Sequence, residues 1–77
     1  MGITPVQCRM ARAALGWGIR DLAARANISA TTVTRFENGL SEPNKLTLLA
    51  MQRALEDGGV EFTNGDQPGV RLKGAKK

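Results

Sequence analysis

The spacing of two short amphipathic segments, residues 19–26 and 30–37, constrains the fold of this chain more than any other feature. Three residues separate the segments, and two of them favour a sharp turn. Asn27 tolerates the left-handed backbone that ends a helix, and Ser29 is a strong helix N-cap. Ala23 is small, which lets two helices approach closely. The sequence therefore predicts two short helices joined by a tight turn at a steep angle.

A third helix is expected before this pair. Thr4-Pro5 is a favourable helix start and Gly16 is a favourable end, which together predict a helix over 5–15. Trp17 follows in the link to the next helix and is expected to pack into the core. The inward face of this helix is predicted from apolar residues spaced three and four apart, namely Cys8, Ala11, Ala14 and Leu15.

A fourth helix is expected over 45–57. Asn44 is its predicted N-cap, Pro43 disfavours a helix before it, and Gly58-Gly59 ends it. The residues predicted to line its inner side are Leu48, Leu49, Met51, Gln52 and Leu55.

Beyond this helix the pattern changes from helical to alternating. Residues 60–63 and 70–73 alternate apolar and polar side chains around a run of turn-forming residues, which predicts a pair of short antiparallel strands. Because an isolated hairpin is marginally stable, these strands must pack on the helices or pair with those of another subunit. The expected organisation is a helical domain over 1–59, a strand pair over 60–73 as a candidate dimerisation element, and a flexible basic tail over 74–77.

The charges are distributed unevenly along the chain. Residues 1–35 carry five arginines against one aspartate, a net charge of +4, whereas residues 36–70 carry two basic against six acidic side chains, a net charge of −4. A basic amino-terminal half is typical of a surface that faces phosphate. An arginine-rich helical surface that is merely solvated is the competing interpretation.

Several classes of function are excluded by composition. The chain has no histidine and one cysteine, so a zinc site and histidine-based catalysis are not expected, and we predict a protein that is not an enzyme and needs no metal or cofactor. Cys8 is expected to be a core residue. No apolar run approaches the roughly 20 residues of a membrane span, and no signal peptide is recognisable, so a cytoplasmic protein without a membrane partner or an evident small-molecule ligand is expected.

The predicted helix over 30–37 carries the functional hypothesis. Its outward side is small, polar or basic, and these are the properties of a helix that enters the major groove of double-stranded DNA. Arginine pairs with guanine, threonine hydroxyls donate or accept, and methyl groups contact thymine. The residues predicted to contact bases are Ala30, Thr31, Thr34 and Arg35.

The sequence also resembles a known family. Residues 7–17, Asp21-Leu22-Ala23, Ile28-Ser29 and Phe36-Glu37-Asn38-Gly39 closely resemble the Cro/C1-type (Xre) helix-turn-helix family, which includes the lambda-like phage repressors. The resemblance covers about residues 6–57. It implies a mainly α fold, a four-helix lambda-repressor-like bundle in which helices 2 and 3 form the helix-turn-helix, followed here by the strand pair.

The resemblance implies roles for individual residues. It places Ala30, Thr31 and Arg35 at base-facing sites, and it implies an internal ion pair between Arg12 and Glu37. An acid at Glu37 that pointed outward would repel DNA, which agrees with such a pair. The residues expected to contact phosphate are Arg9, Ile19 (through its backbone), Arg20, Thr32 and Asn38, the last of which matches the family's phosphate-contacting position.

Two departures from the family pattern predict weaker binding by a single subunit. Gly18 and Ile19 stand where the family usually has a Ser or Thr cap followed by Gln, and Ala30 replaces a longer polar side chain. A transcriptional regulator that binds DNA as a homodimer is therefore one hypothesis. The other is an antitoxin or protein-interaction module that uses the same fold and the strands to bind a protein partner.

Overall fold

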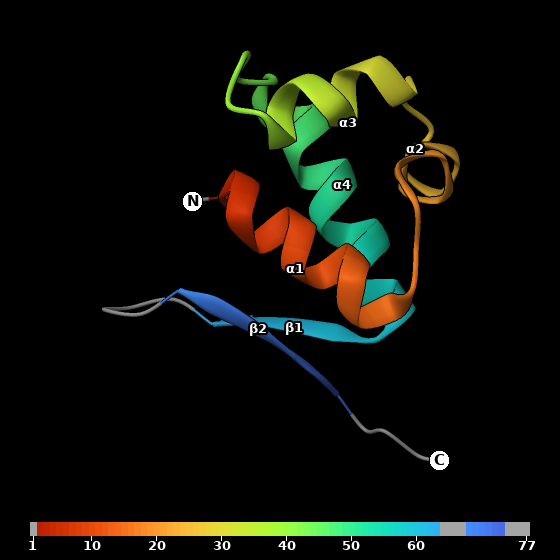
Figure 1. The fold of residues 1–77 in the computed structure, drawn as a ribbon, viewed down its shortest axis with the longest axis vertical. Coiled ribbons are helices and arrows are strands. Elements are labelled where there is room, and N and C mark those ends of the chain that lie inside the picture. Colours follow the sequence, from red (N-terminus) through yellow and green to blue (C-terminus); the bar gives the residue numbers. More distant parts are fainter. Residues whose placement is uncertain (1, 64–67, 74–77) are drawn as a thin grey trace.

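The computed structural model describes residues 2–63 and 68–73 of the chain. It contains four helices and one antiparallel pair of strands, so the predicted mainly α fold is confirmed (Figure 1). The elements are α1 (Pro5–Leu15), α2 (Ile19–Ala26), α3 (Ala30–Glu37), α4 (Lys45–Gly58), β1 (Val60–Thr63) and β2 (Gly69–Leu72). Residues 64–67, which were predicted as part of the turn between the strands, and the predicted tail over 74–77 lie outside the described residues.

Local capping explains why the helices begin where they do. The side chains of Thr4, Ser29 and Asn44 each accept a hydrogen bond from the backbone N–H three residues ahead, at 3.1, 3.1 and 2.8 Å. Each bond satisfies a donor that has no partner within the helix. Asn27, at φ 60°, ends α2 in the left-handed conformation that the sequence predicts.

The core lies between the helices and is closed from below by the strands. Leu22 of α2, Val33 of α3, Met51 and Leu55 of α4 and Val60 of β1 are all fully buried. At about 25 cal/mol per Å² of apolar surface removed from water, burial of this kind stabilises the fold by roughly 1.5–3 kcal/mol per large side chain. Trp17 is only half-buried and packs against the edge of this core.

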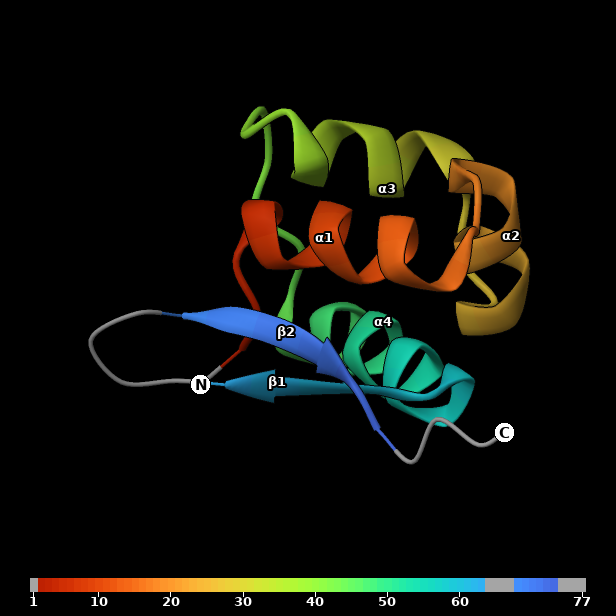
Figure 2. The same ribbon diagram turned by 60° about the horizontal axis from the view of Figure 1, so that its bottom comes forward.

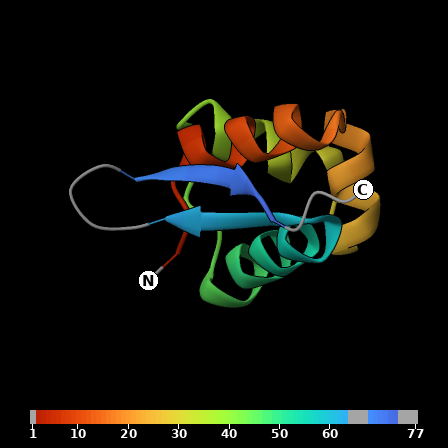
Figure 3. The same cartoon turned by 90° about the horizontal axis from the view of Figure 1, so that it is seen from below.

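The strand pair packs on the helices of its own chain. Its register pairs Val60 with Leu72 and Phe62 with Val70, so these four side chains share one face of the sheet. Figure 3 shows the two strands lying across α1 and α4. Val60, Phe62 and Val70 pack into or against the core, whereas Leu72 is 52% exposed.

One buried amide ties the strands to α1. Gln7 is 1% exposed, and its side-chain nitrogen donates hydrogen bonds to the carbonyl oxygens of Thr63 and Gly69, at 3.0 and 3.2 Å. Its side-chain oxygen accepts from the N–H of Thr4 at 2.9 Å, which completes a capping box at the start of α1. Gln7 therefore joins the helix start to both strands.

Two predictions about burial are wrong. Ala14 is exposed: it lies seven residues after Gln7 and so on the same side of α1, but the strand ends that cover Gln7 do not bury it. Leu49 is 40% exposed, because the buried stripe of α4 passes through Leu48, Met51 and Leu55 and leaves Leu49 at its border. Both residues are apolar and lie at helical spacing from buried residues, so the sequence alone gave no reason to expect them on the surface.

Gly58, in the last turn of α4, is required by a close approach. A Cβ atom there would lie 2.7 Å from the ring of Trp17 and 2.9 Å from a methyl group of Leu15. The next residue, Gly59, ends the helix at φ 119°, a conformation that side chains rarely adopt. The Gly58-Gly59 pair thus lets the link after α1 pack directly on the end of α4.

The elements form a layered arrangement. Viewed in Figure 1, α3 crosses one end of the long axis and the strands lie at the other, with α1 between them. The strands thus lie far from the outward side of α3. Among the described residues, no helix is long and apolar enough to cross a membrane.

Candidate nucleic-acid interface

The turn between α2 and α3 is built from local backbone bonds. Asn27 donates its N–H to the carbonyl of Ala24 at 3.2 Å, and Ile28 donates to that of Ala23 at 2.9 Å, which closes the end of α2. Ile28 is half-buried and packs against the core. Ser29 then starts α3, so the two helices meet after three residues.

The outward side of α3 carries three exposed side chains. Thr31, Thr34 and Arg35 are exposed, whereas Val33 and Phe36 are buried on the opposite side. Two hydroxyls and one guanidinium provide donors and acceptors of the kind that read base edges. Arg35 lies in the last turn, where the helix dipole favours a cation.

Two other residues of α3 are less available than the sequence predicts. Ala30 is half-buried and packs against the core, so it offers part of one methyl group. Thr32 as a residue is also half-buried, and its hydroxyl lies 2.8 Å from that of Ser29, within hydrogen-bond distance. A hydroxyl can both donate and accept, so Thr32 keeps capacity for one further partner.

The acid of α3 points inward. Glu37 is 3% exposed and accepts hydrogen bonds from Nε and Nη2 of Arg12, at 2.7 and 2.6 Å, in a bidentate ion pair. Arg12 also donates to the carbonyl oxygen of Trp17 at 3.1 Å. The pair that the resemblance implied therefore joins α1, the link after it and the end of α3. Figure 2 shows α1 and α3 lying side by side. The pair also removes a negative charge from the outward side of α3.

Cys8 is the third member of this buried group. Its thiol donates to Oε2 of Glu37 at 3.1 Å, the oxygen that also accepts from Nε of Arg12, and Cys8 is fully buried. Burial, and then the hydrogen bond to the Glu37 carboxylate, raise the pKa of the Cys8 thiol far above its usual value. The hydrogen bond to Glu37 likewise raises the pKa of Arg12. Cys8 thus acts as a protonated donor and not as a reactive thiolate.

The predicted phosphate contacts differ in how they are placed. Arg9, Arg20 and Asn38 are exposed on α1, α2 and the end of α3. Ile19 packs its side chain against the core, so only its backbone N–H at the start of α2 is a candidate contact. Arg25 is exposed and lies over the ring of Trp17, with 4.3 Å from its guanidinium carbon to the ring centroid.

The sequence interpretation missed a role for Asp21. Its carboxylate accepts a hydrogen bond from the N–H of Gly18 at 2.8 Å, which is the reciprocal half of a capping box; the other half is missing because Gly18 has no side chain to accept from the helix. An acid three residues after a cap position is the sequence signal for this contact. The negative charge at the start of α2 makes this helix end less attractive to phosphate than an unoccupied one.

The described residues contain no group of three or more His, Cys, Asp or Glu side chains that could hold a metal ion. The arrangement that remains is an outward side of α3 with hydroxyl and guanidinium groups, together with exposed arginines on α1 and α2. Such a surface is suited to contacts with a polyanion.

Comparisons with known proteins identify this architecture. Residues 9–56 match the helix-turn-helix family. The chain is also 38% identical over 66 residues to Multiprotein-bridging factor 1 of Schizosaccharomyces pombe, an alignment that covers 86% of this chain and 42% of that protein. The chain thus spans about two fifths of the length of this relative. On the match over α1 to α4, this chain belongs to the helix-turn-helix family of the Cro/C1 type.

Proposed function

We propose that this chain is a transcriptional regulator that reads the major groove of double-stranded DNA with α3 and does so as a homodimer. Membership of the helix-turn-helix family supports the broader function of a DNA-binding regulator that is not an enzyme. The base-reading residues in this proposal are Thr31, Thr34 and Arg35, with Ala30 as a minor apolar contact.

The observation that carries the proposal is the division of α3 into two sides by charge. Its acid, Glu37, is buried against Arg12, and its exposed side chains on the other side are neutral or basic. A helix surface that is merely solvated has no need to bury its carboxylate, because a buried ion pair costs desolvation of both charges. A surface that approaches phosphates gains from the absence of that charge.

The chemistry of the outward side limits what it reads. Arg35 presents the planar fork that pairs with O6 and N7 of guanine, and the two threonines offer hydroxyl and methyl groups for neighbouring base pairs. Arg9, Arg20, Thr32, Asn38 and the N–H of Ile19 are the proposed phosphate contacts, which position the helix without reading sequence. One subunit therefore reads few base pairs, and a second copy on an adjacent half-site would supply the missing specificity.

Selection of duplexes from a random pool tests the proposal most directly. We expect an enriched motif that contains guanine, with two half-sites about one DNA turn apart. Binding to a random duplex should weaken steeply as salt is raised, because each neutralised phosphate releases counterions. Negligible binding at low salt, with no enriched motif, would refute DNA reading.

A protein-bridging module is the second candidate function. The relative from S. pombe is named for the bridging of proteins, and the described surface includes exposed leucines outside α3, among them Leu40 and Leu46. The same salt titration separates the two candidates. A module that binds only proteins should show no affinity for random duplex even at low ionic strength.

A further inference from the structure

The strand pair has an unpaired edge that the proposed function does not use. Among the described residues β1 is the only strand that pairs with β2, so one side of β2 has no strand beside it. Figure 3 shows β2 on the side of the sheet nearer α1, so its unpaired edge faces away from β1 on that side. Arg71 and Leu72 of β2 are exposed, whereas β1 is buried or half-buried along its length. The edge of β2 is therefore the more accessible one.

The register shows which backbone groups point out of this edge. Lys73 donates its N–H to the carbonyl oxygen of Gly59 at 2.8 Å, which extends the ladder between the strands by one pair. Residues that bond to the partner strand alternate along an antiparallel pair, so Arg71 also turns its backbone toward β1. Val70 and Leu72 turn their N–H and C=O groups away from β1. Within the described part of the chain, these groups are available to an added strand.

An exposed apolar stripe of α1 lies beside the edge of β2. Val6, Met10 and Ala14 follow one another at intervals of four residues, which places them on one side of the helix. Val6 is 56% exposed and Met10 36%, and Ala14 is also exposed. The stripe adjoins Gln7, whose amide donates to the carbonyl oxygen of Gly69 at the start of β2. We call the unpaired backbone of β2 together with this stripe the β2 edge.

The charges around the β2 edge are mainly positive. The sequence of α1 contains no acid, and Arg9 is exposed on it. On the outer face of the strand pair, Glu61 pairs with Arg71 at 2.8 Å, and Lys73 adds a second cation. An extended segment with alternating apolar and acidic side chains matches both properties of the surface. Its apolar side chains cover the stripe, and its acids face the two cations.

A second copy of the chain is a poor occupant of the β2 edge. In the antiparallel register that pairs Val70 with Leu72 of the other copy, Arg71 lies directly opposite the other Arg71. A shift by one bonding pair in one direction places Arg71 opposite Lys73. A shift in the other direction places Pro68, which has no N–H, at a bonding position. Like charges directly opposite each other destabilise a sheet, so pairing of β2 with itself is disfavoured.

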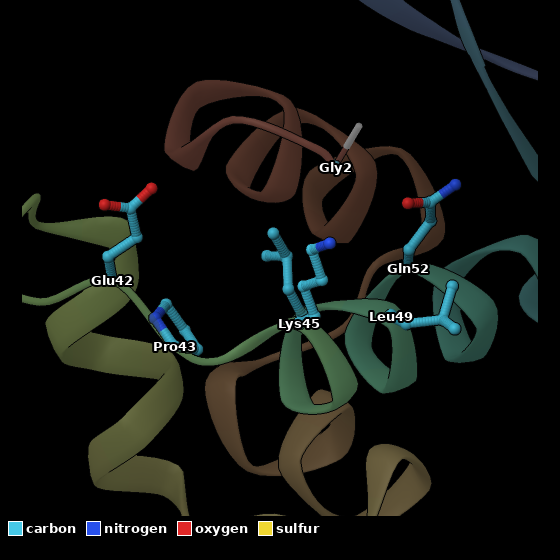
Figure 4. Close-up of a pocket in the computed structure, with 7 residues that line it drawn as sticks. Gly2, Glu42, Pro43, Lys45, Leu49 and Gln52 are labelled. Carbon is cyan, nitrogen blue, oxygen red and sulfur yellow. The ribbon is translucent and has the colours of Figure 1, made fainter.

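The hollow beside the first turns of α4 says less about an occupant (Figure 4). Its volume is about 460 Å³, its lining includes Leu48, Leu49 and Gly2, and Glu42 and Lys45, which also line it, have opposite charges. A helix satisfies its backbone groups internally, so this hollow determines neither the conformation nor the charge of what fills it. The β2 edge determines both, because an unpaired strand accepts an extended segment and the nearby cations favour acids.

From these observations we infer that the β2 edge binds an extended acidic segment of a partner protein as a third strand. The backbone of Val70 and Leu72 pairs with the segment, and its acids lie beside Arg71 and Lys73. The strands lie at the opposite end of the molecule from α3 (Figure 1), so a partner at this edge leaves the proposed DNA-reading side open. The inference goes beyond the proposed function and does not depend on it.

The probe for the test is a short fluorescent peptide of alternating valine and glutamate, whose binding to the full chain is measured by anisotropy. Leu72→Pro should weaken binding by at least about ten-fold, because it removes the outward N–H of β2 and leaves the bonds to β1 intact. Leu72→Val keeps this N–H and is the matched control. Lys73→Glu should weaken binding by about five-fold, whereas Lys45→Glu, the same charge change on α4, should leave it unchanged within about two-fold. Circular dichroism verifies that every variant is folded.

Two further peptides and one amide measurement identify the mode of binding. A peptide N-methylated on the edge that faces β2 keeps its charges but loses its donors, so it should not bind. A peptide of alternating valine and lysine should bind at least about ten-fold more weakly than the acidic one, because it meets cations of its own sign. The acidic peptide should slow hydrogen exchange at the N–H groups of Val70 and Leu72 in the parent chain.

The contrary results are equally specific. Binding that survives N-methylation would overturn the inference, and so would slowed exchange at other residues alone or no binding at the highest soluble peptide concentration. Protection of Val70 and Leu72 that rises with protein concentration without peptide would identify a second copy as the occupant and overturn it as well. Arg35→Ala should leave peptide affinity unchanged, and Leu72→Pro should leave DNA binding unchanged. The inference and the proposed function can therefore fail separately.

Discussion

Removal of Arg12 tests how the orientation of α3 is maintained. In Arg12→Ala the Glu37 carboxylate, 3% exposed, retains the Cys8 thiol at 3.1 Å as its remaining side-chain donor among the described residues. Breaking one side of a buried ion pair costs about 3–5 kcal/mol, and the 18% exposure of the Arg12 side chain favours the lower end. For a domain of this size each kcal/mol lowers Tm by roughly 4–8 °C. We therefore expect a loss of about 12–24 °C.

Thermal and urea unfolding followed by circular dichroism measure this loss. Arg9→Ala is the matched control, since it removes an exposed arginine of the same helix, and it should change stability by no more than about 0.5 kcal/mol. The double variant Arg12→Met with Glu37→Leu replaces the pair by apolar side chains and should recover most of the stability. If Arg12→Ala unfolded within 0.5 kcal/mol of the parent (about the spread of surface substitutions), the reasoning from the buried pair would be refuted.

Three further predictions concern the reading face, the buried thiol and the helix end. Arg35→Ala should weaken binding to the selected motif by about 1–3 kcal/mol at an unchanged Tm, and an unchanged affinity in fluorescence anisotropy would remove Arg35 from the reading face. Because the pKa of the Cys8 thiol is raised in the folded state, the unfolded chain loses this proton at a lower pH than the folded chain does. The free energy of unfolding should therefore fall by about 1.4 kcal/mol per pH unit above a pH of about 8.5. This slope should vanish in Cys8→Ser, and its persistence in urea titrations would assign it to other groups. Gly58→Ala should lower Tm, although alanine normally favours a helix, because its Cβ meets Trp17 at 2.7 Å; a higher Tm would show that the ring moves aside at little cost.

The sequence alone determined where the helices begin and end. Thr4, Asn27, Ser29 and Asn44 act on backbone groups within four residues, so their effect does not depend on the rest of the fold. The predicted limits of the first three helices agree with the structure, and the fourth extends by one residue, to Gly58. The outward side of α3 could be predicted from the helical spacing of its apolar residues, because the side that is buried determines which side is exposed.

Only the tertiary structure decided which apolar and polar side chains the core includes. Gln7 is buried because carbonyl groups 56 and 62 residues away accept from it, and no local pattern predicts such partners. Ala14 and Leu49 are apolar and have the spacing of core residues, but no other helix or strand covers them among the described residues, so both are exposed. The same holds for the strand pair, whose alternation predicted a buried face but not whether helices or a second subunit would cover it. Burial depends on the packing of distant segments, whereas capping depends on neighbours along the chain, and this difference separates what the sequence determined from what the fold decided.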